Sequence, residues 1–354
     1  MVPKSEKRFI RLNLITIVVT LLLILAGGIV RSTGSGMGCP DWPKCFDRYI
    51  PPTSASELPV DYKEKYVAGR IAKNERFAKT LEKMGRAHLA DSVRHDPSIL
   101  LPETFNVAKT WTEYINRLMG ALTGLLLLVL TVYSFTYRKT AKRIVVLSIL
   151  NLFVVGYQGW LGSIVVSTNL MPWVVTVHML LALVILAILV YTYNYTRHLH
   201  EQPTVVMAKL GYLKALIFIA IVLSIVQTVL GTEVREAVDA ISKQLMYTER
   251  DTWIAKVGDI FLYHRDLAVF VLIFNVIIYK MIKDRFNGNA IALLVANGVG
   301  FVLIIQIITG LLLSNFALPP YAQALHILFS TVLFTLQYYL YLLVYRTKTY
   351  LQKH

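Results

Sequence analysis

The stretches EYINRLMG, residues 113–120, and LYHRDLAV, residues 262–269, decide the fold, because they are two similar helix starts within one chain. Each follows a polar loop and runs into a long apolar segment. Their arginines, Arg117 and Arg265, are 148 residues apart (265 − 117 = 148). The residue before the arginine is asparagine in the first stretch and histidine in the second. The pair therefore indicates a repeat, and also a difference between its copies.

The same offset of 148 residues recurs further along the chain. It relates His178 to His326, Pro172 to Pro320, Leu170 to Leu318, Gly162 to Gly310 and Gln158 to Gln306. A constant offset at six positions in three helices indicates an internal duplication. GGIVR, residues 27–31, resembles GTEVR, residues 231–235, at an offset of 204, so the first outer loop is 56 residues longer (204 − 148 = 56). The chain is predicted to form two parallel-repeat halves, residues 1–200 and 201–354.

The composition predicts a membrane protein. Hydrophobic residues make up 56% of the 354 residues, which is too apolar for a soluble domain of this size. A helix needs about 20 apolar residues to cross the hydrocarbon core. Eight such runs are present, at about 12–30, 116–136, 144–166, 174–194, 211–232, 265–282, 289–313 and 322–345. The predicted fold class is an all-α polytopic membrane protein with eight transmembrane helices, arranged as two parallel-repeat four-helix bundles. The first run lacks a small-residue cleavage site and is expected to be a retained helix.

The loops predict the orientation in the membrane. The net charge is +15, and the basic residues gather before the first span, in alternate short loops such as 138–143, and after the last span. The short loops STNLMPW, residues 167–173, and SNFALPP, residues 314–320, carry no charge. By the positive-inside rule both termini are expected in the cytoplasm and the neutral loops outside. The positive charge thus needs no nucleic-acid partner.

The long outer loops contain two further features. Cys39 and Cys45, in GMGCPDWPKC, are the only cysteines and bracket two prolines on the oxidising side of the membrane. They predict a disulfide, with either a structural or a redox role. Apolar residues at helical spacing predict a helical cap on the outer surface. These residues are Phe77, Leu81 and Met84 in the first loop, and Val234, Val238, Ile241 and Leu245 in the second.

Three histidines, His178, His264 and His326, lie near the outer ends of predicted spans. A single histidine at a helix end is usually an interfacial or hydrogen-bonded residue, but polar groups at related positions in membrane helices indicate function. Two imidazoles from neighbouring helices, with no zinc-type pattern, suit a haem iron held within a four-helix bundle. We therefore expect His264 and His326 to bind haem. Arg265 would pair with a haem propionate or, alternatively, with a lipid headgroup.

The equivalent positions in the first half are Asn116 and His178. Asparagine is a poor iron ligand, so this half cannot form the same two-histidine site. Glu113 precedes Asn116 by three residues and shares its helix face, whereas its counterpart in the second half is Phe261. The first half thus has one strong ligand, a carboxylate and an open coordination side, which is typical of catalytic metal sites. The alternative for Glu113 is an acid favoured by the helix dipole.

Several motifs together resemble the haem A synthase family over nearly the whole chain. They are GGIVRSTGSGMGCPDWPKC (27–45), EYINRLMG (113–120), QGWLGSIVVSTNL (158–170), YHRD (263–266) and LPPYAQALH (318–326). The resemblance implies oxidation of the C8 methyl group of haem O to a formyl group, by two successive hydroxylations with water as the oxygen source. It implies that His264 and His326 hold a permanent haem b and that Glu113 and His178 belong to the substrate site, with His178 on the substrate iron. The family's paired cysteines match Cys39 and Cys45.

The remaining site predictions follow from position. Asn116 and Arg117 are expected to contact the substrate, and Arg31 and Arg235 to bind propionates, as Arg265 would. The implied partners are haem O, haem O synthase, the assembly of a haem-copper oxidase and membrane lipid, and self-association into a homo-oligomer is compatible with the sequence. The expected location is the cytoplasmic membrane.

The sequence departs from the family pattern at two places, and two other functions compete. The family usually has histidine in place of Asn116, and the outer loop 233–260 lacks a second cysteine pair. A non-catalytic membrane cytochrome b that passes electrons would use His264 and His326 but would leave Glu113 without a purpose. A transporter would also have parallel repeats, but Pro172 and Pro320 lie in outer loops instead of interrupting the spans.

Overall fold

The computed structural model describes residues 3–101, 104–202, 205–206, 211–285 and 290–349. Its helices are α1 (Lys4–Ser32), α2 (Tyr62–Lys83), α3 (Ala87–Arg94), α4 (Val107–Ser134), α5 (Lys142–Ser167), α6 (Pro172–Arg197), α7 (Gly211–Gln244), α8 (Trp253–Lys256), α9 (Asp259–Arg285), α10 (Ala290–Asn315) and α11 (Pro320–Arg346). Short 3-10 turns are η1 (Ala55–Glu57), η2 (Pro97–Leu100), η3 (Phe135–Tyr137) and η4 (Arg250–Thr252). The strands β1 (Val205–Val206) and β2 (Lys348–Thr349) form one short parallel pair.

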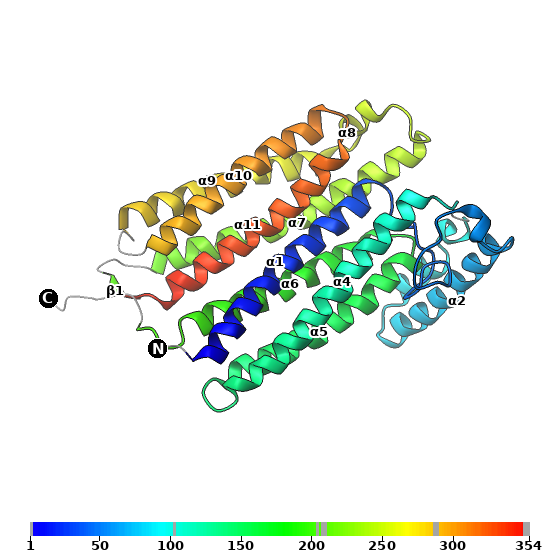
Figure 1. Cartoon of the computed structure of the whole chain (residues 1–354). Coiled ribbons are helices and arrows are strands. Elements are labelled where there is room, and N and C mark those ends of the chain that lie inside the picture. Colours follow the sequence, from blue (N-terminus) through cyan, green and yellow to red (C-terminus); the bar gives the residue numbers. More distant parts are fainter. Residues whose placement is uncertain (1–2, 102–103, 203–204, 207–210, 286–289, 350–354) are drawn as a thin grey trace.

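Among the residues that the structure describes, eight helices are long and apolar enough to cross a membrane, as the sequence predicts. They are α1, α4, α5, α6, α7, α9, α10 and α11. Each helix is longer than its predicted apolar run; α1, for example, begins at Lys4 and ends at Ser32, against a predicted run of about 12–30. The predicted span 289–313 corresponds to α10, and residue 289 itself lies outside the described residues. The start of α1 and the end of α11 lie at the same end of the bundle, whereas α2 lies at the opposite end (Figure 1).

The helices of the two halves have the same neighbours. In the first half α1 packs against α4 and α6, and α5 packs against α4 and α6. In the second half α7 packs against α9 and α11, and α10 packs against α9 and α11. Each half is therefore a ring of four helices, in which α4 and α6, or α9 and α11, face each other diagonally. This arrangement is consistent with the predicted parallel repeat.

The halves pack tightly against each other through α1 and α11. An added Cβ atom at Gly28 would lie 3.2 Å from the Cα atom of Ala324, so the two backbones approach closely. Small residues allow such approach between membrane helices. At the end of the bundle where α1 begins, Phe9 and Tyr137 pack edge to face in the core of the first half. The two halves thus form one continuous helical body.

The outer loops form the predicted helical cap, with two corrections. Phe77 and Leu81 of α2 are buried and pack with α5 and α6, but Met84 is 69% exposed. The helix ends at Lys83, so Met84 no longer shares the buried face. In the second loop the segment with Val238 is not a separate cap helix, because it continues α7 to Gln244. Val238 packs there with Trp253 and Leu318.

Candidate functional site

The second half brings His264 and His326 together across its bundle. His264 lies on α9 and His326 on α11, the two helices that face each other diagonally. Their ring centroids are 6.3 Å apart. Two imidazoles on opposite sides of one metal ion, each with a metal–nitrogen bond of about 2 Å, have ring centres about 6 Å apart. The spacing of the two rings therefore suits two axial ligands of one ion.

Neighbouring helices contact both histidines: a threonine contacts the ring of His326, and a glutamine binds the backbone carbonyl of each residue. Thr309 Oγ1 lies 2.8 Å from His326 Nδ1, which leaves Nε2 of that ring for a ligand. Gln306 Nε2 donates to the His326 carbonyl at 2.8 Å, and Gln227 Nε2 donates to the His264 carbonyl at 2.8 Å. A metal-binding histidine usually has its second ring nitrogen held by such a partner, which fixes the tautomer and the ring direction.

Glycines leave space beside the same two rings. A Cβ atom added at Gly231 would lie 3.2 Å from His264 Cε1, and one added at Gly310 would lie 3.6 Å from His326 Cε1. His264 Nδ1 is buried without a hydrogen-bond partner in the described part of the chain. An oriented imidazole pair, glycines beside both rings and an unpaired buried nitrogen together fit a haem whose iron takes two axial histidines. His264 and His326 are the residues that would hold it.

The first half has the same scaffold but different polar groups. Gln158 Nε2 donates to the His178 carbonyl at 2.7 Å, as Gln306 does in the other half. An added Cβ atom at Gly162 would lie 3.3 Å from His178 Cε1. The counterpart of Thr309 is Leu161 (309 − 148 = 161), and His178 Nδ1 is buried with no hydrogen-bond partner in the ranges that the structure covers. His178 therefore lacks the side-chain contact that orients His326.

Asn116 lies on α4, diagonally across the first bundle from the helix that carries His178. Its Oδ1 atom is buried and has no hydrogen-bond partner among the described residues. That oxygen lies 3.9 Å from the position of a Cβ atom added at Gly27 of α1. The place where the second half has His264 thus carries an unpaired amide oxygen.

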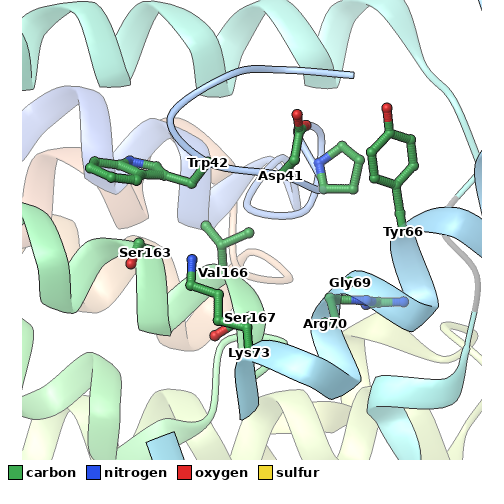
Figure 2. Close-up of a pocket in the computed structure, with 10 residues that line it drawn as sticks. Asp41, Trp42, Tyr66, Gly69, Arg70, Lys73, Ser163, Val166 and Ser167 are labelled. Carbon is green, nitrogen blue, oxygen red and sulfur yellow. The ribbon is translucent and has the colours of Figure 1, made fainter. Parts of the chain in front are cut away.

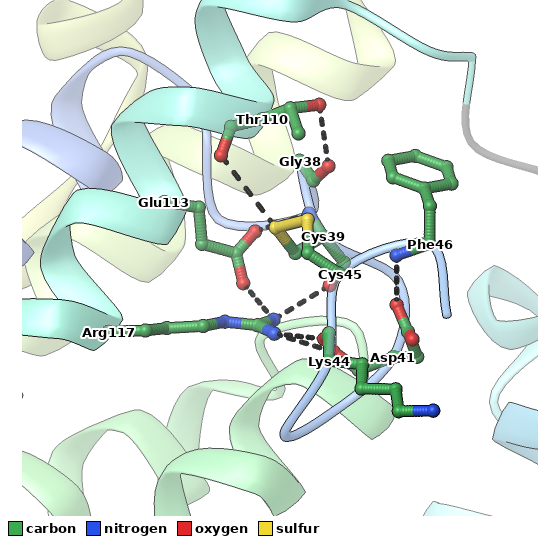
Figure 3. Close-up of polar contacts among 9 residues, drawn as sticks. All are labelled: Gly38, Cys39, Asp41, Lys44, Cys45, Phe46, Thr110, Glu113 and Arg117. Atoms are coloured by element: carbon green, nitrogen blue, oxygen red, sulfur yellow. Dashed lines mark hydrogen bonds and ion pairs between the residues drawn. A yellow bond between two sulfur atoms is a disulfide. The ribbon is translucent and has the colours of Figure 1, made fainter. Parts of the chain in front are cut away.

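Glu113 and Arg117 bind the loop that contains the predicted disulfide (Figure 3). The disulfide between Cys39 and Cys45 is present, as the sequence predicts. Glu113 is 3% exposed, and its Oε2 accepts a hydrogen bond from the Cys39 amide at 2.7 Å. Its Oε1 accepts one from Arg117 Nη2 at 2.5 Å. The carboxylate therefore connects α4 directly to the backbone of the disulfide.

Arg117 uses its other donors on the same loop. Nη1 donates to the carbonyls of Asp41 at 2.6 Å and Lys44 at 2.9 Å, and Nη2 donates to the carbonyl of Cys39 at 2.8 Å. These contacts account for the four N–H groups of the two Nη atoms, together with the bond to Glu113. The role of Arg117 that the structure describes is to hold this loop, and its predicted contact with the substrate stays a prediction.

The disulfide loop also fits closely onto the first turn of α4. Thr110 Oγ1 donates to the Gly38 carbonyl at 2.8 Å. A Cβ atom at Gly38 would lie 2.5 Å from the carbonyl of Lys109, so only glycine allows this approach. Phe46, just after the disulfide, packs edge to face on Tyr66 of α2 and on Phe105. The loop is thus held between α2 and α4.

The arginines Arg31 and Arg235 converge on one carboxylate, although they come from different halves. Arg31 of α1 pairs with Asp239 of α7, and Arg235 pairs with the same carboxylate at 2.9 Å. Arg235 also donates to Gln323 of α11. Arg265 instead pairs with Asp266 at 3.0 Å, and both side chains are 60% exposed. The structure therefore groups two of the three predicted propionate ligands and leaves the third apart.

The sequence analysis did not single out Thr309, Gln227, Asp239 and Gln323, although all four make contacts in the site. Thr309 could have been found from the repeat, since the histidine-facing helix has leucine at the matching position in the other half. Asp239 follows Arg235 by four residues, a spacing that favours an ion pair on a helix. Its second partner, Arg31, lies 208 residues away in sequence, and no local pattern reveals it.

Comparison with known proteins identifies one matching family and several relatives, which match between about half and nine-tenths of the chain. The COX15-CtaA family model, described as "Cytochrome oxidase assembly protein", matches residues 10–77 and 98–338. The chain is 30% identical over 183 residues to a protein of Shewanella oneidensis named "Heme A synthase", which covers 52% of this chain and 44% of the relative.

Two further relatives carry the same name. The protein of Ehrlichia canis is 30% identical over 176 residues, which cover 48% of this chain and 44% of the relative. The protein of a Wolbachia from Brugia malayi is 23% identical over 337 residues, 90% of this chain and 91% of the relative. The matches to the Shewanella and Ehrlichia proteins thus span less than half the length of those relatives.

Proposed function

Because the chain belongs to the COX15-CtaA family of cytochrome oxidase assembly proteins, we propose that it is an enzyme of haem A biosynthesis, a haem A synthase. Its substrate is haem O, and its product carries a formyl group in place of the C8 methyl group. The relatives named "Heme A synthase" support this activity. The observation that carries the proposal is the difference between the halves: an oriented histidine pair in one, and Asn116, His178 and a buried Glu113 in the other.

The reaction requires an electron acceptor, water and a group that accepts protons. The first hydroxylation converts a methyl group and water to a hydroxymethyl group, two protons and two electrons. The second hydroxylation consumes another water molecule, forms a geminal diol and again releases two protons and two electrons. The diol then loses water to give the formyl group. The electrons pass to an external electron acceptor. Glu113 is the acid–base group that accepts or positions protons near the substrate.

The second half holds the resident cofactor. When bound, haem b supplies one-electron transfer. His264 and His326 are the residues that would hold it, Thr309 would keep the His326 ring in one tautomer, and the glycines beside the rings would leave space for the group. Two strong ligands favour a cofactor that stays, because both coordination positions are filled.

The first half holds the substrate. His178 binds the substrate iron, and Asn116 lies on the opposite helix, where a second imidazole would hold the porphyrin more strongly. Glu113 lies one helical turn before Asn116. The substrate must enter and the product must leave, so one strong ligand suits this half better than two.

Location and partners follow from the same proposal. The eight spans make the chain a multi-pass membrane protein. We place it in the cytoplasmic membrane with both termini in the cytoplasm, so that the histidines and the disulfide lie toward the outer face. Haem O synthase would supply the substrate, and the assembly of a haem-copper oxidase would consume the product.

Pigment analysis tests this function. Cells that express the chain together with a source of haem O should accumulate haem A, and the purified protein should contain haem b with traces of haem O or haem A. A purified protein with haem b alone, from cells that contain haem O and no haem A, would contradict the proposal. That result would favour a cytochrome b that only transfers electrons.

A further inference from the structure

A cavity opens between the disulfide loop, α2 and the outer end of α5 (Figure 2). Its volume is about 160 Å³. Its lining includes Trp42 from the loop, Tyr66 and Lys73 from α2, and Ser163 and Val166 from α5. One water molecule needs about 10–15 Å³ of such cavity volume, so the cavity has room for a small polar side group of a larger ligand.

Three charged residues line this cavity: the cations Lys73 and Arg70 of α2 and the carboxylate of Asp41. The Lys73 side chain reaches from α2 toward Trp42 and Ser163 (Figure 2), and its Nζ lies 6.0 Å from the centre of the Trp42 ring. Burial lowers the pKa of Lys73, and the positive charge of Arg117 lowers that pKa further. Within the ranges that the structure describes, no carboxylate forms an ion pair with Lys73. A partly buried cation without an ion-pair partner favours an anionic ligand.

The charge of Asp41 raises the pKa of Lys73 and so opposes the effect of burial in part, but the two side chains form no ion pair in the described residues. Asp41 lines the cavity, but its carboxylate accepts hydrogen bonds from the amides of Phe46 at 2.6 Å and Asp47 at 2.9 Å. Ser163 is also engaged, since its hydroxyl donates to the Trp160 carbonyl of its own helix at 2.7 Å. Arg70 Nη2 donates to the Leu101 carbonyl at 2.6 Å. Lys73, whose side chain extends toward Trp42 and Ser163, is therefore the cation through which this cavity would bind a negative group.

The cavity lies directly outward of the first half's histidine. Gly162 of α5 faces the His178 ring, at 3.3 Å between an added Cβ atom and Cε1. Val166 lies four residues further along α5, hence one turn outward on the same face, and it lines the cavity. One helical turn is about 5.4 Å, which is within reach of an acidic side arm of a porphyrin whose iron lies at His178.

We propose that this cavity is a carboxylate subsite for the substrate, in which Lys73 binds a propionate group of haem O. The inference rests on the function proposed above and adds α2, an element of the outer loop, to the substrate site. It also explains why the disulfide loop is held so closely to α4 by Glu113 and Arg117. That loop supplies the Trp42 wall of the subsite.

A binding titration tests the subsite. Protein purified with its haem b is titrated with haem O, and separately with the dimethyl ester of haem O, while the optical spectrum is followed. We expect Lys73→Gln to weaken binding of the free acid about tenfold, because a charge-assisted hydrogen bond is lost. The same substitution should leave binding of the ester unchanged, and Lys73→Arg should restore most of the affinity for the free acid.

The matched control is Lys79→Gln, which removes the same charge from α2 at a side chain that is 66% exposed and pairs with Glu75. It should bind both forms as the parent does. Equal loss of both forms in Lys73→Gln, or no loss of either, would overturn the subsite.

A separate arm distinguishes a lipid from the substrate. If Lys73→Gln binds haem O as the parent does but no longer copurifies with anionic phospholipid, the cavity binds a lipid headgroup and the proposal is wrong. If the parent protein itself neither binds nor oxidises haem O, the proposed function has failed, and that failure is visible without any substitution.

Discussion

The two halves of the molecule share a scaffold and differ in the side chains at the end of the bundle that carries the histidines. In both, a glutamine of the third helix donates to the backbone carbonyl of a histidine on the fourth, at 2.7 Å for Gln158 and 2.8 Å for Gln306. In the second half Thr309 orients the histidine ring, whereas the first half has Leu161 there. The shared contacts fix where the histidines lie, and the differing ones decide how firmly each is held.

Arg117 and Arg265 occupy matching positions in the two halves and also differ in their contacts. Arg117 is largely buried and binds three carbonyls of the disulfide loop, whereas Arg265 is 60% exposed and pairs with its neighbour Asp266. The difference follows from the extra 56 residues of the first outer loop, which fold back over α4. A duplicated helix start thus acquires a new role when an insertion supplies new partners.

The largest expected effect is on haem b binding, which should depend on His326 and not on His178. His326→Ala removes one of the two proposed haem b ligands, so haem b should bind more than about 100-fold more weakly, since loss of even an outer partner of a metal ligand costs about 10–100-fold. His178→Ala should keep the haem b of the second half. Haem content and the low-spin optical spectrum of both purified variants measure this. A full, unchanged low-spin spectrum in His326→Ala would contradict the assignment.

The second prediction concerns Glu113. Glu113→Gln keeps the size of the side chain and removes the charge, so haem A formation should fall roughly 100-fold or more, as is typical for loss of a general acid or base. Haem O or a hydroxylated intermediate should accumulate, and haem b should remain. Extracted pigments from cells with a haem O source measure the effect.

The matched control for Glu113 is Asp266→Asn, which removes a carboxylate from the equivalent helix start of the second half. Its side chain is 60% exposed, and haem A formation should be unchanged. Parental haem A formation in Glu113→Gln would show that the carboxylate only holds the disulfide loop.

The sequence predicted the eight spans, because the length and hydropathy of each run directly reflect the thickness of the bilayer. It also predicted the disulfide, since Cys39 and Cys45 had no other cysteine partners. The repeat placed His264 and His326 on the second and fourth helices of one half, and in the structure the centres of their rings are 6.3 Å apart. These predictions depend on periodicity and spacing, which a single sequence contains.

The remaining contacts depend on tertiary packing. Nothing near Glu113 in sequence indicates that its carboxylate accepts from the Cys39 amide, 74 residues away. The shared pairing of Arg31 and Arg235 with Asp239 likewise requires the two halves to be packed together. Such contacts join polar groups that are distant in the chain, and helical periodicity carries no information about them.

The third prediction tests the orientation of the haem b ligand. Thr309→Val keeps the shape of the side chain but leaves His326 Nδ1 without its partner, so haem b affinity should fall about tenfold. Thr331→Val is the control, because Thr331 is also buried but bonds only to the Ile327 carbonyl of its own helix. Competition for haem with an apo-haem-binding protein measures the affinity. Equal affinities in both variants would show that Thr309 does not orient the ligand.

The smallest expected effect comes from placing a histidine at position 116, so that both halves have a histidine pair. Asn116→His introduces on α4 the residue that α9 has at the matching position, and Gly27 leaves space beside it. With imidazoles on both diagonal helices, the first half should retain its porphyrin after purification and show a second low-spin component. Turnover should fall only severalfold, since Glu113 and His178 remain and product release becomes slower.

Asn116→Gln, which keeps the amide, is the control for that change and should show no second low-spin component. The comparison of the halves predicts a specific pair of results for Asn116→His: more bound haem and slower haem A formation. If bound haem and turnover both stay at the parental level, residue 116 does not face the substrate iron. The difference between the asparagine and the histidine would then have no part in separating a site that releases its haem from one that keeps it.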